Sequence, residues 1–470
     1  MKQTSTSMTS PDAKELYRFI KLNHLQIDQL GNCSNFVVAL SGGLDSMVML
    51  RLMLELRYQY DIQFSAIHVH HGLSINADDW QRSVEKYCEI NQIPLQSHKL
   101  SIEKAPQRSL EQIARDARYA LFAEALPSNT LVFTGHHLQD QTETFFLRLA
   151  RGSGSKGLAS MTAISDLPNH QGKRKQIKLV RPLLSLSKGQ LQSYAQSQFL
   201  EWIEDESNQD THFDRNYIRH ELTPVLEKRW PKIGSSIKTS TELLSKENEL
   251  LGIYLSEELA QLLEPGVYGF EALNLEKWEK LQTLKQAELI RVFIKHRTSR
   301  APSRNVLAEV MSNVIASKDD SQPKVVMSDF TIRRFKNKLY CEQIEQAPLP
   351  QLMSCSPSNI SGNSSVVHSH FVFPEGSLYQ NKRIEIKLHN SITLNESNTL
   401  VVRWGQVGDK IQPNQSSGNK KVSELLKQLG CPAWLRSRVP LLYLNDELVS
   451  VIGYAIAYPF QSHIELDFSR

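Results

Sequence analysis

The stretch FVVALSGGLDS, residues 36–46, constrains the fold of this 470-residue chain more than any other. Its first half is an apolar, β-rich run, which is typical of a strand buried on both faces of a parallel sheet. A serine and two glycines over 41–43 interrupt the run, and the apolar spacing over 44–57 predicts a helix. The stretch therefore predicts a strand, a glycine turn and a helix start that surround one concavity.

Such a turn collects free backbone N–H groups, which bind anions, and glycine lets a phosphate approach without meeting a Cβ. A carboxylate at Asp45 beside phosphates indicates a bound cation such as Mg²⁺. The spacing is not that of a Walker A loop, which has a lysine before its Ser/Thr. An ordinary βα turn is the alternative, but ATP binding is the better interpretation. The candidate ATP-binding residues are Ser41, Gly42, Gly43, Leu44, Asp45 and Ser46.

Composition is ordinary for a soluble globular protein of two to four domains, with 40% hydrophobic and 22% charged residues. No apolar run reaches the length of a signal peptide core or of a membrane span, so we expect a cytoplasmic protein without a membrane partner. The net charge of +4 is compatible with a nucleic-acid partner. Five scattered cysteines without a CxxC pair argue against a disulfide framework, a zinc site and an iron–sulfur cluster.

Three histidines follow the second predicted strand in the motif HVHHGLS, residues 68–74. His68 and His70 alternate onto one strand face, and His71 begins the loop at the carboxyl end, where open α/β sheets bind ligands. A metal site is the alternative, yet no carboxylate or cysteine follows at ligand spacing. We therefore expect these histidines to line a nucleotide pocket.

Two further motifs carry charged side chains toward the same sheet edge. In ARDARYALF, Arg115 and Arg118 share a helix face. The alternative to a role at the site is that this face is a solvated, salt-bridged surface. In GHHLQDQTET, residues 135–144, the carboxylates of Asp140 and Glu143 face one way at a helix start. Paired carboxylates near a phosphate site suit a divalent ion that bridges phosphate oxygens.

Basic residues recur in the rest of the chain. Arg215 and Arg219 fall in a helical pattern at the end of the polar run 202–219. The segment IRRFKNKLY, 332–340, is a candidate phosphate-contacting ribbon. Near the carboxyl end, Trp434 accompanies a basic cluster that suits contact with an RNA backbone, although a solvated helix is the alternative. That cluster consists of Lys420, Lys421, Lys427, Arg436 and Arg438.

Together these motifs resemble the bacterial tRNA(Ile)-lysidine synthetases, a family of PP-loop ATP pyrophosphatases. The resemblance is carried in chain order by SGGLDS, HVHHGLS, ARY, GHHLQDQTETF with RGSGSKGL, WIEDESNQDTHFDRNYIR, GDKIQP, the KKV segment and WLRSRVPLL. One position departs from the family pattern of two adjacent aspartates, because the first of them is Gln139 here. The metal role therefore moves to the carboxylates that remain.

The resemblance implies an α/β fold, in which a PP-loop domain with a parallel sheet flanked by helices precedes a mainly helical domain and a small α+β domain. The expected boundaries are 1–215 for the catalytic domain, 216–345 for a tRNA-contacting domain, 346–365 for a linker and 366–470 for a C-terminal tRNA-binding domain.

The resemblance also implies an activity, namely ligation of free L-lysine to the wobble cytidine of the isoleucine tRNA with a CAU anticodon, using ATP and Mg²⁺. Asp45 and Asp140 would hold the metal, and Arg118 would stabilise developing phosphate charge. The implied catalytic residues are Asp45, Arg118, Asp140 and Glu143; the implied tRNA-binding residues are Arg215, Arg219, Lys420, Lys421, Lys427, Arg436 and Arg438. A second copy of the chain is a further candidate partner.

Two alternatives stay open. A PP-loop tRNA thiolase would normally need paired cysteines or an iron–sulfur cluster, which the cysteine spacing disfavours. A non-catalytic RNA-binding protein on the same fold is disfavoured because the acidic and basic candidates are all present.

Overall fold

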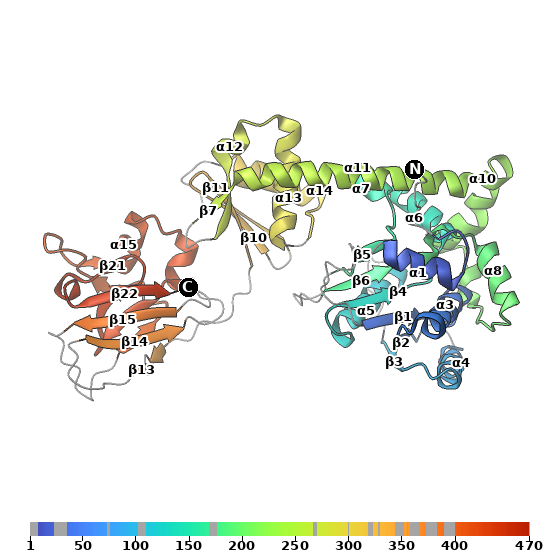
Figure 1. Ribbon diagram of the computed structural model, residues 1–470. Helices are drawn as coiled ribbons and strands as arrows, with labels where there is room; N and C mark the ends of the chain where they lie inside the picture. The colour runs from blue at the N-terminus through green and yellow to red at the C-terminus, as the bar shows by residue number, and fades with distance from the viewer. Residues whose placement is uncertain are drawn as a thin grey trace. The chain divides into compact units, whose positions relative to one another are not determined.

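The structure is a computed structural model in which two compact units, Met1–Gly252 and Ile253–Arg470, are described separately (Figure 1). The described residues are 8–22, 35–72, 76–101, 110–168, 176–266, 270–298, 300–317, 323–327, 330–343, 352–354, 356–357, 366–372, 383–389 and 400–469. No helix within these ranges is both long and apolar enough to span a membrane.

The first unit is built on one sheet, whose described strands follow the order β3-β2-β1-β4-β6-β5. The strands are β1 (Asn35–Leu40), β2 (Ser65–His70), β3 (Leu95–Lys99), β4 (Thr130–Phe133), β5 (Ile164–Asp166) and β6 (Ile177–Val180). Neighbours pair in parallel except at β5, an antiparallel edge strand. The chain thus extends one way from β1 to β3 and the other way from β4 to β6, as in a doubly wound fold.

Helices cover both faces of this sheet because β1 alternates between two cores. Val38 and Leu40 pack with α3, while Val37 and Ala39 pack with Phe122 of α5. The helical segments are α1 (Ala13–Leu22), α3 (Leu44–Tyr60), α4 (Ala77–Ile90), α5 (Leu110–Ala125), α6 (Leu138–Ala150), α7 (Ser155–Leu158), η1 (Pro182–Ser185), α8 (Lys188–Ser197), η2 (Glu206–Gln209), α9 (Asp214–Tyr217), the π-helical η3 (Ile218–Leu222), α10 (Thr223–Arg229) and α11 (Ile233–Leu262). The predicted buried central strand is confirmed.

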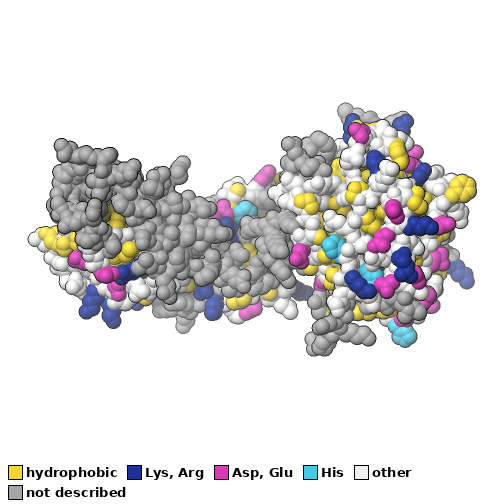
Figure 2. Space-filling view, turned by 90° about the horizontal axis from the view of Figure 1, so that it is seen from below, with side chains coloured by type: hydrophobic (Ala, Val, Ile, Leu, Met, Phe, Trp, Pro, Cys, Tyr) yellow, Lys and Arg dark blue, Asp and Glu magenta, His cyan; other side chains and the backbone are white. Residues whose placement is uncertain are grey.

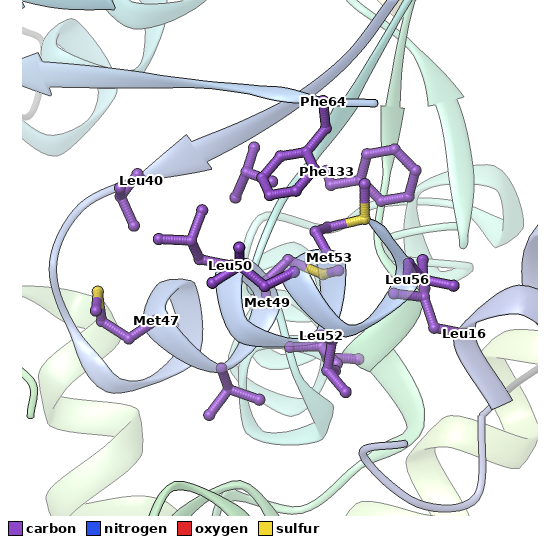
Figure 3. Close-up of a cluster of buried hydrophobic side chains, with 14 of the residues drawn as sticks. Leu16, Leu40, Met47, Met49, Leu50, Leu52, Met53, Leu56, Phe64 and Phe133 are labelled. Carbon is purple, nitrogen blue, oxygen red and sulfur yellow. The ribbon is translucent and has the colours of Figure 1, made fainter. Parts of the chain in front are cut away.

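The larger core lies around α3, a helix that is apolar on nearly every side. Figure 3 shows Met49, Leu50 and Met53 of α3 packed among Phe64 and Phe133. A helix buried all round is held by neighbours on every side, here α1, α8 and the sheet. The start of α3 is therefore a rigid platform at the carboxyl end of β1.

The end of α8 carries an unfavourable backbone conformation. Phe199 has φ +50° and a side chain that is 93% exposed. Its N–H donates to the Gln196 carbonyl at 3.1 Å, and the Leu200 N–H donates to the Ala195 carbonyl at 2.9 Å. This is the Schellman arrangement, whose left-handed position glycine normally occupies.

We therefore expect Phe199→Gly to raise the free energy of unfolding by about 0.5–1 kcal/mol, because relief of left-handed strain exceeds the added entropy of the unfolded chain. Urea unfolding measures the change. Phe199→Ala, which keeps the strain and removes only the ring, should leave stability nearly unchanged. Equal effects of both variants would contradict this explanation.

The second unit begins with helices against an antiparallel sheet of order β7-β8-β11-β10-β9 in its described residues. Its elements are β7 (Leu263–Pro265), β8 (Glu271–Asn274), α12 (Leu275–Glu279), α13 (Thr283–Thr298), α14 (Arg304–Glu309), the π-helical η5 (Val310–Ile315), β9 (Lys324–Met327), β10 (Phe330–Phe335) and β11 (Lys338–Gln343). The helices implied for the domain over 216–345 are present, and a five-stranded antiparallel sheet accompanies them.

The remainder contains two described sheets, β12-β16-β19-β20-β21 and β13-β14-β15-β22, and a short β17-β18 pair. Its elements are β12 (Leu352–Ser354), β13 (Ser356–Pro357), β14 (Val366–Val372), β15 (Arg383–His389), β16 (Leu400–Arg403), β17 (Lys410–Ile411), β18 (Lys420–Lys421), α15 (Val422–Gln428), η6 (Ala433–Arg438), β19 (Leu441–Leu444), β20 (Glu447–Val451), β21 (Ala455–Ile456), η7 (Tyr458–Phe460) and β22 (Ile464–Ser469). One apolar core includes side chains from both sheets, and a second includes α15 and η6.

The predicted boundaries stay predictions. The first compact unit extends to Gly252, beyond the expected end at 215, because α9 and η3 pack against α6 and α11 is hydrogen-bonded to α6 and α7. Most of the expected linker 346–365 lies outside the described residues, although β12 and β13 fall within it.

Candidate functional site

The SGG turn lies between β1 and α3 and is closed by one hydroxyl group. Ser46 Oγ accepts hydrogen bonds from the Ser41 N–H at 3.2 Å and the Gly42 N–H at 3.1 Å. It also donates to the Gly43 carbonyl at 2.9 Å. The Ser46 hydroxyl thus holds the turn in shape, and the predicted role of Ser46 in ATP binding stays a prediction.

Two glycines permit close approaches that other residues would block. Gly42 has φ +89°, and a Cβ there would lie 2.6 Å from Ile203 Cδ1. A Cβ on Gly135 would lie 2.7 Å from the backbone carbonyl of Asp45. Since backbone atoms cannot turn aside as a side chain can, Gly135 brings the loop after β4 directly against the start of α3.

A cavity of about 420 Å³ opens where the loops after β1, β2 and β4 meet. This is the point at which the strand order reverses, where open α/β sheets bind ligands. On the face of the first unit seen in Figure 2, histidine, acidic and basic side chains lie close together. The charged or polar lining residues are Ser41, Asp45, Ser46, His68, His70, His71, Arg118, Tyr119, Thr134, His136, Asp140 and Asp205.

An imidazole stands between the two carboxylates that the sequence assigned to a metal. His137 Nε2 lies 3.5 Å from Asp45 Oδ2 and 3.8 Å from Asp140 Oδ2. His137 is the N-cap of α6, where its Nδ1 accepts from the Gln139 N–H at 3.1 Å. The Asp140 carboxylate completes the capping box by accepting from the His137 N–H at 2.9 Å.

The two carboxylates differ in electrostatic environment. Burial raises the pKa of Asp45, Asp140 raises it further, and His137 opposes the rise. Asp45 Oδ1 is buried without a hydrogen-bond partner among the described residues. Burial also favours the neutral form of Asp140, but the neighbouring His137, His136 and Arg215 outweigh it and lower its pKa to about 2.

The third predicted carboxylate, Glu143, is fully buried and bound to two arginines. Its Oε2 accepts from Arg215 Nε at 2.8 Å, and its Oε1 accepts from Arg219 Nε at 2.7 Å. Arg215 Nη1 also pairs with Glu111 of α5 at 3.0 Å. Burial and Asp140 raise the pKa of Glu143, which both guanidiniums oppose. Glu143 is absent from the cavity lining, so its predicted catalytic role stays a hypothesis.

The same contacts bear on the arginines that we assigned to tRNA. Asp140 Oδ1 lies 4.0 Å from Nη2 of Arg215 and 3.9 Å from Nη2 of Arg219. Both side chains are mostly buried in the first unit. Their contacts in the structure are thus with acidic side chains around the cavity, and a role in tRNA binding stays a prediction.

All three predicted pocket histidines line the cavity. His68 Nδ1 donates to the Leu40 carbonyl at 2.8 Å, and burial lowers its pKa. His70 Nδ1 accepts from the Gly72 N–H at 3.1 Å, and its Nε2 lies 3.0 Å from Asp78. Burial, with Arg118 nearby, lowers the pKa of His71 to about 4.

Arg118 also lines the cavity, as expected. Its guanidinium lies 5.8 Å from the centre of the Tyr119 ring, and burial lowers its pKa. His136, which received no role from the sequence, donates to or accepts from Thr134 Oγ1 at 2.8 Å. Burial lowers the pKa of His136 to about 3, so its ring is neutral near pH 7.

Several lining residues were missed, although most lie inside motifs that the sequence had singled out. His136 and Gly135 belong to GHHLQDQTET, and Asp205 belongs to the polar run 202–219. Gln139, in contrast, does not appear among the described lining residues, whereas Asp140 does. The part of the chain that the structure describes holds no group of three or more His, Cys, Asp or Glu side chains placed to bind a metal.

In the second unit, the predicted basic cluster divides into two parts. Lys421 and Lys427 are exposed, and Lys420 Nζ donates to Gln428 Oε1 at 3.1 Å. Arg436 Nε instead donates to the Cys431 carbonyl at 3.2 Å, and the positive charge of Arg438 acts to lower the pKa of the half-buried Glu342.

The predicted phosphate ribbon 332–340 is largely engaged within the unit. Arg334 Nη1 donates to the Ile315 carbonyl at 2.6 Å, and Lys338 Nζ donates to the Pro265 carbonyl at 2.9 Å. Arg333 lies over the ring of Trp434 at 5.1 Å.

Family models match three segments of the chain. A model described as a PP-loop domain matches residues 15–226, a TilS substrate binding domain matches 273–340, and a TilS substrate C-terminal domain matches 400–465. Among solved structures, the U34-tRNA thiolase NcsA from Methanococcus maripaludis, determined with its 4Fe-4S cluster, is 22% identical with a TM-score of 0.35. That likeness covers 49% of this chain and 80% of the other.

Curated relatives match the chain along most of its length. The tRNA(Ile)-lysidine synthase of Vibrio atlanticus is 33% identical over 432 residues, which cover 89% of this chain and 92% of the relative. The tRNA(Ile)-lysidine synthase of Coxiella burnetii is 33% identical over 438 residues, which cover 93% of this chain and 92% of the relative. The PP-loop segment, both further domains and these full-length relatives place the chain in the tRNA(Ile)-lysidine synthase family.

Proposed function

We propose that this chain joins the ε-amine of free L-lysine to carbon 2 of the wobble cytidine in isoleucine tRNA with a CAU anticodon, with ATP converted to AMP and pyrophosphate. The observation that carries the proposal is the cavity at the strand-order reversal, which collects the SGG turn, Asp45, Asp140 and Arg118. A phosphate-binding turn with acidic and cationic side chains suits transfer of an adenylyl group.

In the first step, the 2-carbonyl oxygen of the cytosine attacks the α-phosphorus of ATP, and pyrophosphate leaves. The turn at 41–43 and the start of α3 bind the phosphates. Arg118 faces the cavity, and none of the described carboxylates forms an ion pair with it. Its guanidinium is therefore available to stabilise the charge that develops on the phosphate oxygens.

The acidic centre fits a magnesium ion. Asp45 Oδ1 is buried without a partner, and Asp140 is ionised beside it, so the two supply the carboxylate oxygens that Mg²⁺ prefers. Asp45 and Asp140 would hold the ion together with phosphate oxygens, and the ion would neutralise charge on the leaving pyrophosphate.

In the second step, the lysine ε-amine attacks carbon 2 of the adenylated cytidine, and AMP leaves with the former carbonyl oxygen. His71 and His136 are neutral near pH 7 because burial lowers the pKa of each. Neutral rings can form hydrogen bonds with a nucleobase without adding charge to the cavity.

We place the reaction in the cytoplasm, where tRNA, ATP and free lysine occur together.

The test is incubation of the full chain with ATP, radiolabelled lysine and total tRNA, followed by nucleoside analysis. We expect a labelled nucleoside that requires ATP and tRNA, and AMP formation that requires tRNA. Binding of tRNA without consumption of ATP would instead support the non-catalytic alternative. Incorporation of sulfur from a labelled donor, with no lysine incorporated, would support the thiolase alternative.

The exposed lysines near α15 are the best-placed candidates for tRNA contact in the second unit. We expect Lys421→Ala with Lys427→Ala to weaken tRNA binding and to lower the salt slope of log K by about 1–2, since each phosphate contact contributes roughly 0.7–0.9. Filter binding at several salt concentrations measures both. The matched control, Lys14→Ala with Lys86→Ala, removes the same charge from exposed helix positions of the first unit. Equal salt slopes in both double variants would refute the assignment.

A further inference from the structure

Trp434 of η6, which accompanies the basic cluster suggested for RNA contact, packs against protein side chains. Its ring packs edge-on against Phe335 of β10, with centroids 5.7 Å apart and planes at 90°. Tyr340 of β11 contacts the same ring at 6.4 Å, and the Arg333 guanidinium lies 5.1 Å from its centre. A single tryptophan of the C-terminal part is therefore held by three side chains of the sheet that precedes it.

A half-buried carboxylate completes this contact. Trp434 Nε1 donates to Glu342 Oε1 at 2.8 Å. Burial raises the pKa of Glu342. The hydrogen bond from Trp434 and the positive charges of Arg333, Arg438 and Arg297 oppose this rise. Two of these arginines belong to the 253–343 part and one belongs to η6, so guanidiniums from both parts surround one carboxylate.

A second contact reinforces the first. Phe270, which precedes β8, packs against the core that contains α15, η6 and Tyr443. Aromatic pairs, a cation–π contact and a charge-assisted hydrogen bond each favour one relative orientation of the groups that form them. We call Trp434, Phe335, Tyr340, Arg333 and Glu342 the Trp434 clasp.

We propose that the Trp434 clasp locks the 253–343 part and the 400–469 part into one rigid tRNA-binding body, and that this lock sets the affinity for tRNA. The second half of the proposal depends on the proposed function. The clasp holds the exposed lysines of β18 and α15 at a fixed position relative to β10 and β11. Trp434 is thus a positioning residue, which contacts protein rather than RNA.

A lock and a direct contact make different predictions for binding. When only a fraction of molecules has the competent arrangement, the apparent dissociation constant rises by the inverse of that fraction. The bound state still contains the same phosphate contacts, so the salt slope does not change. Loss of a direct contact would instead lower affinity and slope together.

The experiment compares Trp434→Ala in the full chain with the matched control Trp230→Ala, which removes an exposed tryptophan from the first unit. We expect about a tenfold loss of tRNA affinity, corresponding to a docked fraction near one tenth, with an unchanged salt slope and unchanged ATP binding. Unchanged affinity, or a reduced slope, would overturn the proposal.

Hydrogen exchange of residues 431–439 in the absence of tRNA tests the docking itself. We expect faster exchange in Trp434→Ala but not in Trp230→Ala, and equal exchange would overturn the lock. This arm requires no tRNA, so it separates failure of the inference from failure of the proposed function. Trp434→Phe keeps an aromatic ring but removes the donor to Glu342 and part of the ring surface; we expect an intermediate effect, and this variant remains informative if Trp434→Ala does not fold.

Discussion

Replacement of Asp45 by asparagine is expected to reduce tRNA-dependent pyrophosphate release by at least about a hundredfold, the effect typical of losing one electrostatic contact to a transition state. The carboxylate lies at the start of α3 inside the cavity, and its Oδ1 has no hydrogen-bond partner among the described residues. Asparagine has nearly the same shape but no charge for a cation. Steady-state pyrophosphate release with saturating ATP and tRNA measures the loss.

The same substitution should not destabilise the chain. Burial raises the pKa of Asp45, so the folded chain binds this proton more tightly than the unfolded chain does. Ionisation of Asp45 as the pH rises above the ordinary aspartate range therefore lowers the free energy of unfolding. At neutral pH without ligand, Asp45→Asn should melt at the same temperature as the wild type or at a higher one.

The matched control is Asp79→Asn on α4, where an exposed aspartate pairs with Arg82. It should change neither pyrophosphate release nor melting temperature measurably. Near wild-type release by Asp45→Asn would show that the metal role proposed for Asp45 is wrong. A large fall in its melting temperature would show that the carboxylate has a structural role instead.

Replacement of Glu143 by glutamine is expected to lower the free energy of unfolding by about 3 kcal/mol, because it leaves two mostly buried guanidiniums with only Glu111 and Asp140 to balance their charge. Glu143 is fully buried and accepts hydrogen bonds from both Arg215 and Arg219. Urea unfolding measures the change.

The control for Glu143→Gln is Glu85→Gln, an exposed position on α4 that should change stability by less than about 0.5 kcal/mol. The comparison separates two roles for Glu143. If Glu143 acts by positioning the arginines, Glu143→Gln should lose both stability and activity. Full stability with abolished activity would favour the direct catalytic role that the sequence suggested.

Much of the fold around the cavity could be predicted because its signals are local. The apolar run at 36–40, the glycines after it and the periodicity of α3 each depend on a few consecutive residues. The histidines at 68, 70 and 71 follow from the same logic, since the carboxyl end of a parallel strand is a known position in space.

Pairings between distant residues could not be predicted. Arg215 and Arg219 suited RNA by charge type, yet Glu143 lies 72 and 76 residues away in sequence. Trp434 meets Glu342 at a separation of 92 residues. Periodicity gives the face on which a side chain lies but not what that face packs against. The short strands β7 and β8 were missed because three or four apolar and polar residues fit a helix end equally well.

The arginine pair also has a mechanical consequence. Arg215 belongs to α9 and Arg219 to η3, and the chain continues from them through α10 into α11, which reaches residue 262. The first anchor of this helical arm is therefore Glu143, and Asp140 is one turn away on α6. Any load that a bound macromolecule applies along these helices is therefore expected to reach Glu143 and the neighbouring Asp140. The π-helical η3 lies between this anchor and α10, and π-helical turns are often found at functional sites.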